Sequence, residues 1–361
     1  MTIISPKKIT LSATLFCLLT LPLFCHGSQE SSQEPVQESA VVLMYHHFGD
    51  DRYRSTNIKL DQFDTQLDYL QQEGFNVWPV DKILHHLDND QPLPNKTIAI
   101  TMDDAYRSVY SEAYPRLKEL GWPFTVFVST DYIDKKYSNY MTWEQMQEME
   151  AHGASYGNHS RSHDYLIRFK EGEDQKSWRK RIKSDLQHAQ QRLNKELTKV
   201  LPILAYPYGE YDLPLTEIVS ELNLIAMGQQ SGAIGKHSDK RFLPRFPMAE
   251  AFAEMTSFKT KINSFALPVV KAEPTEPKTE ETQPRLTVTV AKSDARLKQL
   301  ACYASGQGKI KIEWLSENQF TVQAVSDLPA GRSRYNCTAP SKEAGRFYWF
   351  SQPWIRPGGE N

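Results

Sequence analysis

Strand-like and helix-like patterns alternate between residues 41 and 246, and this alternation limits the folds that the chain can adopt. Short apolar runs typical of buried strands are followed by segments whose apolar residues recur at helical spacing. The strand-like runs are 41–45, 75–78, 98–102, 124–128, 201–206, 224–227 and 242–246. Strands that alternate with helices pair in parallel, so the pattern predicts an α/β fold with a closed or nearly closed β/α barrel. A doubly wound open sheet is the alternative.

The composition changes after residue 267. Residues 268–284 are rich in Pro, Glu, Thr and Lys, which is typical of a linker without core residues. Beyond it, alternating patterns at 286–290, 310–314, 320–325 and 346–350 predict a small antiparallel β-domain, residues 285–361. The aromatic run 347–350 and Trp354 are either core or a sugar-stacking face. Cys302 and Cys337 are predicted to form one disulfide.

Residues 1–27 have the pattern of a cleaved secretory signal. Lys7 and Lys8 precede an apolar stretch from 9 to 24, which is interrupted by Pro22 and is short for a membrane span. A lipid-modified Cys25 is the alternative. Residues 28–39 are expected to be a flexible lead-in to a barrel of residues 40–267. We therefore expect a secreted protein, periplasmic or extracellular, with no transmembrane segment after signal removal.

The charge balance argues against a nucleic-acid partner. The chain of 361 residues has a formal net charge of −2, and loss of Lys7 and Lys8 with the signal brings it to −4. A binder of nucleic acid would be expected to be basic. The composition, with 40% hydrophobic and 24% charged residues, is that of an ordinary globular protein. Nothing in the sequence indicates the oligomeric state.

Two adjacent carboxylates end the apolar run 98–102. Asp103 and Asp104 would point to opposite faces of a regular strand, so they can serve one site only if the chain turns there. Side by side, they would both stay ionised only with a cation between them or with different roles. The alternative is that Asp104 caps a helix and Asp103 lies in solvent.

Two later segments carry further candidate site residues. His159 and His163 are four residues apart, a spacing that lets both imidazoles reach one zinc-type cation, with Ser160 and Ser162 orienting the rings. A chance pair of surface histidines is the alternative. Residues 205–209, Ala-Tyr-Pro-Tyr-Gly, form a rigid turn after a strand, and such a turn can direct backbone N–H groups at an oxyanion.

These segments, in this order, resemble the polysaccharide deacetylase family of carbohydrate esterases. The family's Thr-Phe-Asp-Asp-Gly motif corresponds to residues 101–105, its His-Ser-x-x-His motif to 159–163, and its Arg-x-Pro-Tyr-Gly motif to 205–209. The resemblance covers residues 40–250. It implies a distorted β/α barrel of about seven parallel strands, followed here by the small C-terminal β-domain.

The resemblance also implies a mechanism. A divalent metal, zinc or else cobalt or nickel, would be held by Asp104, His159 and His163. Asp103 would act as general base on a metal-bound water, and Tyr208 would offer its backbone N–H to the tetrahedral intermediate. The expected reaction is hydrolysis of N-acetyl groups on an N-acetylhexosamine polysaccharide, which is the expected partner.

The chain departs from the family pattern at two points. Ala205 stands where the family has an arginine that holds the base, and Arg245 is a candidate substitute. The late segment that carries the general acid is missing, but residues 42–46 resemble it moved to the front, as in permuted biofilm poly-β-1,6-N-acetylglucosamine deacetylases. This arrangement makes His46 the expected acid, with His47 or His237 as alternatives. A catalytically impaired carbohydrate-binding protein and an O-acetyl esterase are the rival functions.

Overall fold

The computed structural model describes residues 1–3, 5, 6, 8 and 38–358. The expected signal and lead-in, residues 1–39, lie almost wholly outside the described residues, although Ser39 already opens the first strand. None of the helices in this described part combines the length and the apolar character that crossing a membrane requires.

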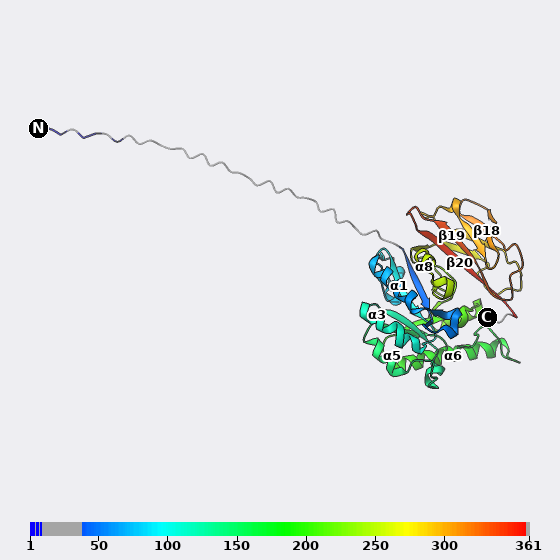
Figure 1. Cartoon of the computed structure of the whole chain (residues 1–361). Helices are drawn as coiled ribbons and strands as arrows, with labels where there is room; N and C mark the ends of the chain where they lie inside the picture. Colours follow the sequence, from blue (N-terminus) through cyan, green and yellow to red (C-terminus); the bar gives the residue numbers. More distant parts are fainter. Residues whose placement is uncertain (4, 7, 9–37, 359–361) are drawn as a thin grey trace. The chain divides into compact units, whose positions relative to one another are not determined.

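A curled, mostly parallel sheet forms the first part of the fold (Figure 1). Its path runs β1, β5, β6, β7, β8 and β9. At the far end, Leu243 pairs in parallel with Met227, and Phe246 pairs in parallel with Leu43. Residues 243–247 therefore lie between β9 and β1 and complete the ring of pairings, which confirms the β/α barrel. The strands are β1 Ser39–Tyr45, β5 Thr97–Met102, β6 Phe124–Val128, β7 Ala154–Asn158, β8 Val200–Ala205, β9 Ile225–Met227 and β11 Phe246–Pro247.

Helices between the strands bury one apolar face on this sheet. Helix α6, for example, buries Trp178, Ile182, Leu186, Ala189 and Leu193 at helical spacing. A capping box at Thr142 begins α5, since the Thr142 side chain accepts the N–H of Gln145. The helices are α1 Leu60–Gln72, α2 Val80–Asp88, α3 Tyr114–Leu120, α4 Thr130–Asp134, α5 Trp143–Glu150, α6 Gln175–Glu196, α7 Leu213–Glu221 and α8 Met255–Ile262.

Short elements lie at the edges and loops of the barrel. They are β2 His47–Phe48, β3 Asn57–Ile58, β4 Asn76–Val77, β10 Ile234–Gly235 and the single-turn helices η1 Asp51–Thr56, η2 Val109–Ala113, η3 Pro207–Gly209 and η4 Glu250–Ala253. The turn η2 runs directly into α3, and Pro115 falls in the first turn of α3. The proline thus stands where a new α-helix begins.

The C-terminal residues form two mostly antiparallel sheets (orange and red in Figure 1). One sheet contains β12 Ser264–Ala266, β20 Phe347–Arg356, β19 Gly331–Pro340, β15 Ala301–Ala304 and β16 Gly308–Ile310, with η5 Leu297–Gln299 in a connection. The other contains β13 Val269–Glu273, β14 Leu286–Val290, β18 Gln319–Val322 and β17 Ile312–Trp314. Cys302 and Cys337 face each other on β15 and β19 and form the predicted disulfide. Trp354 is fully buried, so its side chain belongs to the core.

The expectation of a linker over the whole of residues 268–284 is wrong. Strand β13 lies inside this segment and pairs with β14, and Val269 and Ala272 pack against the second core. The strand could not be recognised from the sequence, because many Lys, Glu and Thr residues surround these two apolar positions. The C-terminal sheet is also joined to the barrel part, because β12 pairs in parallel with β20 and Trp349 packs edge-on against Phe246.

Candidate active site

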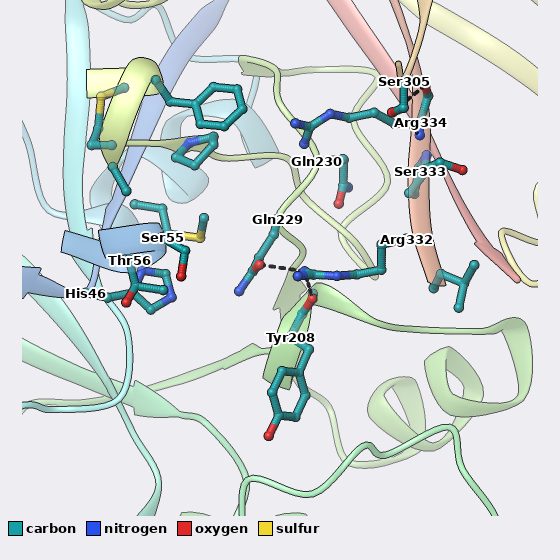
Figure 2. A pocket seen from close by; sticks show the side chains of 18 of the residues that line it. His46, Ser55, Thr56, Tyr208, Gln229, Gln230, Ser305, Arg332, Ser333 and Arg334 are labelled. Atoms are coloured by element: carbon teal, nitrogen blue, oxygen red, sulfur yellow. Dashed lines mark hydrogen bonds between the residues drawn. The ribbon is translucent and has the colours of Figure 1, made fainter. Parts of the chain in front are cut away.

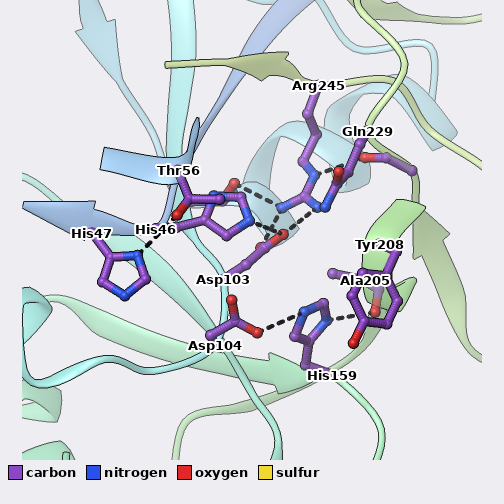
Figure 3. A network of polar contacts seen from close by, with 12 residues as sticks. His46, His47, Thr56, Asp103, Asp104, His159, Ala205, Tyr208, Gln229 and Arg245 are labelled. Carbon is purple, nitrogen blue, oxygen red and sulfur yellow. Dashed lines mark hydrogen bonds and ion pairs between the residues drawn. The ribbon is translucent and has the colours of Figure 1, made fainter. Parts of the chain in front are cut away.

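The residues singled out from the sequence gather at the carboxyl ends of the parallel strands. His46 follows β1, Asp103 and Asp104 follow β5, His159 follows β7, and η3 with Tyr208 follows β8. Loops at this edge of a β/α barrel are the usual place for chemistry, because all the strands end there. Arg245 joins them from the segment that completes the ring (Figure 3).

A left-handed turn directs the two carboxylates to different partners. The φ angles of Asp104 and Ala105 are 71° and 58°, a region that non-glycine residues rarely adopt. Both acids are buried, Asp103 completely. The alternative that Asp103 lies in solvent is therefore wrong. Backbone strain of this kind persists where surrounding contacts hold it and is common at functional sites.

Asp104, His159 and His163 form a cluster that could hold a metal ion, with their ligand atoms all within 4.8 Å of one another. Oδ1 of Asp104 lies 3.3 Å from Nε2 of His159 and 3.1 Å from Nε2 of His163. Nδ1 of His159 lies 2.8 Å from the carbonyl oxygen of Ala205, which can only accept, so the ring donates there and leaves Nε2 for the cluster. Two imidazoles and one carboxylate fit a zinc-type cation.

The protonation of this cluster follows from its contacts. Burial alone would raise the pKa of Asp104, but hydrogen bonds from His159 and His163 hold it well below its usual value. Burial would lower the pKa of His159, yet the hydrogen bond to Asp104 leaves that pKa raised. The carboxylate therefore stays ionised and draws positive charge to this position, as a metal site requires.

Ser160 and Ser162 hold the loop rather than the histidine rings. Oγ of Ser160 accepts the backbone N–H of His163 at 2.8 Å, and Oγ of Ser162 lies 3.0 Å from Oδ2 of Asp185. The expectation that these serines orient the rings is wrong in this respect. For His159, the carbonyl of Ala205 takes that place.

Arg245 is the partner of Asp103. Its Nη1 and Nη2 lie 2.7 and 2.8 Å from the two carboxylate oxygens, and its Nε donates to the carbonyl of Gly228 at 3.0 Å. Both side chains are fully buried. Burial alone would raise the pKa of Asp103, but the charge of Arg245 brings it below its usual value. The arrangement keeps a buried carboxylate ionised and fixed in orientation.

His46 lies on the other side of Asp103, with Nε2 3.7 Å from Oδ2, and its side chain is 13% exposed. Burial lowers the pKa of His46, against the opposing charges of Asp103 and Asp104. His47 points away from this cluster: its Nδ1 contacts Thr56, and its ring stacks on Tyr106 (Figure 3). His237 is exposed and lines a different cavity. Of the three histidines considered, His46 is the one beside Asp103.

Tyr208 occupies the turn expected to offer an N–H group. Its φ is 59°, and its ring stacks on Tyr165 and contacts the edge of His163. The carbonyl oxygen of Tyr208 accepts a hydrogen bond from Nη1 of Arg332, which also lies 2.9 Å from Oε1 of Gln229 (Figure 2). Sequence reasoning missed Arg332 and Gln229, because neither belongs to a motif.

A cavity of about 650 Å³ opens over these residues. Its lining includes His46, the metal cluster and Tyr208 from the barrel, and Arg332 and Arg334 from β19. This volume lies within the usual range for sites that bind small molecules or sugar units. The fold and the site together define a β/α-barrel protein with a two-histidine, one-aspartate centre at the carboxyl ends of its strands.

Comparison with known proteins agrees with this class. Residues 90–227 match the sequence profile of the polysaccharide deacetylase family. YxkH of Bacillus subtilis, a protein assigned to the polysaccharide deacetylases, is 27% identical over 171 residues, which cover 47% of this chain and 57% of that protein. The poly-β-1,6-N-acetyl-D-glucosamine N-deacetylase of Staphylococcus aureus (strain MRSA252) is 21% identical over 202 residues, covering 55% of this chain and 69% of that protein.

The solved structure of IcaB from Ammonifex degensii superposes with a TM-score of 0.53 at 26% identity, covering 61% of this chain and 96% of that one. The chain therefore carries a polysaccharide deacetylase domain, and its homologues are hydrolytic deacetylases. The family is in general metal-dependent, in keeping with the Asp104, His159 and His163 cluster.

Proposed function

We propose that this protein is a secreted, metal-dependent deacetylase that removes N-acetyl groups from an N-acetylhexosamine polysaccharide. The proposal rests on one observation, that the two adjacent carboxylates have different partners. Asp104 faces two histidines, whereas Asp103 faces Arg245 and His46. One acid is thus placed to hold a cation, and the other to move a proton beside it.

Each step of amide hydrolysis has a residue positioned for it. Asp103 is the general base and accepts the proton of the attacking water, and Arg245 keeps it ionised until then. The backbone N–H of Tyr208 donates to the oxyanion that develops on the acetyl carbonyl. His46 is the general acid and protonates the departing amine, a poor leaving group that needs the proton.

The cation held by Asp104, His159 and His163 is proposed to be zinc, with cobalt or nickel as substitutes. A divalent cation at such a site polarises a carbonyl and favours ionisation of water. The protein itself determines the position of the substrate, because the buried pair of Asp103 and Arg245 and the turn at Tyr208 fix where the acetamide must lie.

Secretion is proposed from the N-terminal pattern of residues 1–27 and from the disulfide between Cys302 and Cys337. Disulfides persist in the bacterial periplasm and outside cells and are rare in the cytosol. A polymer outside the cell is therefore the substrate proposed for this chain.

Acetate release from matched oligosaccharides tests the proposal. N-acetylglucosamine oligomers should release acetate, a chelator should abolish the release, and zinc or cobalt should restore it. Oligomers that carry only O-acetyl groups should react much more slowly. Preferential release from the O-acetylated set would replace the proposal by an O-acetyl esterase, and metal binding without acetate release from either set would replace it by a carbohydrate-binding protein.

A further inference from the structure

One wall of the cavity comes from the C-terminal domain. Arg332 and Arg334 are two residues apart on strand β19, so their side chains project from the same face of the sheet. Both arginines line the cavity that also contains His46, His163 and Tyr208 (Figure 2). A substrate bound at the metal cluster would therefore meet these two guanidinium groups.

The two arginines carry positive charges without an ion-pair partner among the described residues. Arg332 donates to the neutral oxygens of Tyr208 and Gln229, and the guanidinium of Arg334 lies over the ring of Phe252, 5.8 Å from its centre. Asp104, which belongs to the metal cluster, is the single acidic residue among those that the structure places around this cavity. The wall is thus a cationic surface facing a space large enough for sugar units.

Arg332 is exposed and Arg334 is half-buried, so water screens their like charges only in part, and a bound anion would relieve the repulsion between them. Partial burial lowers the pKa of Arg334, and the charge of Arg332 lowers it further, so the charged form of Arg334 is disfavoured beside Arg332. The charge of nearby Glu210 favours the charged form of Arg332. An anionic group on the ligand is therefore the natural partner of this wall.

We propose that the polysaccharide substrate is acidic, with a sugar carboxylate that binds Arg332 and Arg334 while the acetamido group of a neighbouring residue lies at the metal cluster. The inference rests on the proposed deacetylase function and names its substrate class. The planar guanidinium fork matches the geometry of a carboxylate, and a sugar ring can pack on the 45% exposed Phe252 beside it.

Short hyaluronan oligosaccharides, in which N-acetylglucosamine alternates with glucuronic acid, and their carboxyl-reduced counterparts test this inference. The two sets share linkage and length and differ only in charge. Acetate release and binding by titration calorimetry are measured for both sets with the zinc-loaded full chain and with Arg334→Gln, Arg334→Lys and Lys309→Gln. Lys309 is exposed on strand β16 of the same sheet and does not line the cavity, so Lys309→Gln is the matched control for loss of one charge.

The expected result is a preference of about tenfold or more in KM and Kd for the acidic set in the wild-type chain, with kcat little changed. Arg334→Gln should lose most of this preference, whereas Arg334→Lys and Lys309→Gln should keep it. Equal binding of the acidic and reduced sets by the wild-type chain would overturn the inference, as would an equal loss on both sets in Arg334→Gln.

The two proposals fail separately. If neutral N-acetylglucosamine oligomers are deacetylated and the acidic set has no advantage, the deacetylase proposal stands and the inference is wrong. If the acidic set binds through Arg334 but no acetate is released from any oligosaccharide, the inference of an acidic ligand stands and the proposed deacetylase function is wrong.

Discussion

Asp103 and Asp104 share a peptide bond but have different chemistry. The positive φ angles at Asp104 and Ala105 separate their side chains, and each then meets a different partner. Asp104 lies within 3.3 Å of two imidazoles, whereas Asp103 is held by both Nη atoms of Arg245. Burial disfavours the charged form of both carboxylates. The contacts that keep each carboxylate ionised therefore determine its role.

Substitutions should separate these roles. His159→Ala and His163→Ala should lose both metal and turnover, because a site with three protein ligands tolerates few losses. Asp103→Asn should retain metal but lose turnover, since an amide cannot accept a proton. Metal content by elemental analysis and acetate release measure the two properties, and loss of metal from Asp103→Asn would contradict the assignment.

His46 is predicted to matter only where the leaving group needs a proton. His46→Ala should slow amide deacetylation by roughly 10²- to 10⁴-fold, the usual contribution of a positioned acid. Hydrolysis of an activated aryl acetate should be nearly unchanged, because an aryl oxide leaves without protonation. Equal losses on both substrates, together with lost metal, would make His46 a ligand or a fold residue instead.

At the scale of secondary structure, α8 is fixed by a buried lysine. Lys261 is 4% exposed, and its Nζ donates to the carbonyl oxygens of Pro247 on β11 and Phe252 on η4. Burial lowers the pKa of Lys261 to about 7, with a smaller contribution from the charge of Arg334. These hydrogen bonds hold α8 against the end of the barrel, although burial disfavours the charged ammonium group of Lys261.

This lysine predicts a pH dependence of stability. Between about pH 7 and the unfolded pKa near 10.4, the unfolded chain binds a proton that the folded chain has released, so stability should rise with pH. The slope should be at most about 1.4 kcal/mol per pH unit and should be absent in Lys261→Met. Urea unfolding across this range measures both chains, and parallel pH curves would show that Lys261 does not titrate there.

Local sequence patterns predicted most of the elements but not the pairings between distant segments. The runs 98–102 and 124–128 are short apolar stretches that can be recognised within a few residues, and the structure has strands there as predicted. Strands β12 and β13 leave little such signal, because their partners are distant in sequence or their strands are short and partly exposed. The pairing of β12 with β20 joins residues about eighty positions apart and could not be read locally.

In the candidate site too, residues in short motifs could be predicted, whereas contacts between distant segments could not. His159, His163 and the Asp pair stand in short motifs, so their grouping could be predicted. Arg245 was identified only as a candidate, and its contact with Asp103 spans 142 positions. Arg332 reaches Tyr208 across 124 positions and was missed entirely.

For the whole molecule, the sequence pattern separates a barrel of residues 40–267 from the C-terminal domain, but in the structure the two share contacts. A chain that ends at 267 would leave β12 without its partner β20 and Phe246 without Trp349. Phe246 is fully buried and Trp349 is half-buried, so loss of this contact together with the strand pairing should cost roughly 3 kcal/mol and lower Tm by several degrees.

Calorimetry of the truncated chain, with full-length Trp349→Ala as the comparison, measures this effect. The truncated chain should be less stable than Trp349→Ala, because it loses the strand pairing as well as the ring. A truncated chain as stable as the full one would mean that residues 40–267 are an independent domain.

The contact between Arg332 and Tyr208 also sets an order of assembly. The residues proposed to hold metal and move protons have all been synthesised by residue 245, but the side chain that grips the turn at Tyr208 comes from the last tenth of the chain. A chain that stops before β19 would contain the proposed metal ligands and the proposed general base. The turn at Tyr208 would then lack its contact with Arg332. The cavity therefore takes its described form only in a chain that includes strand β19.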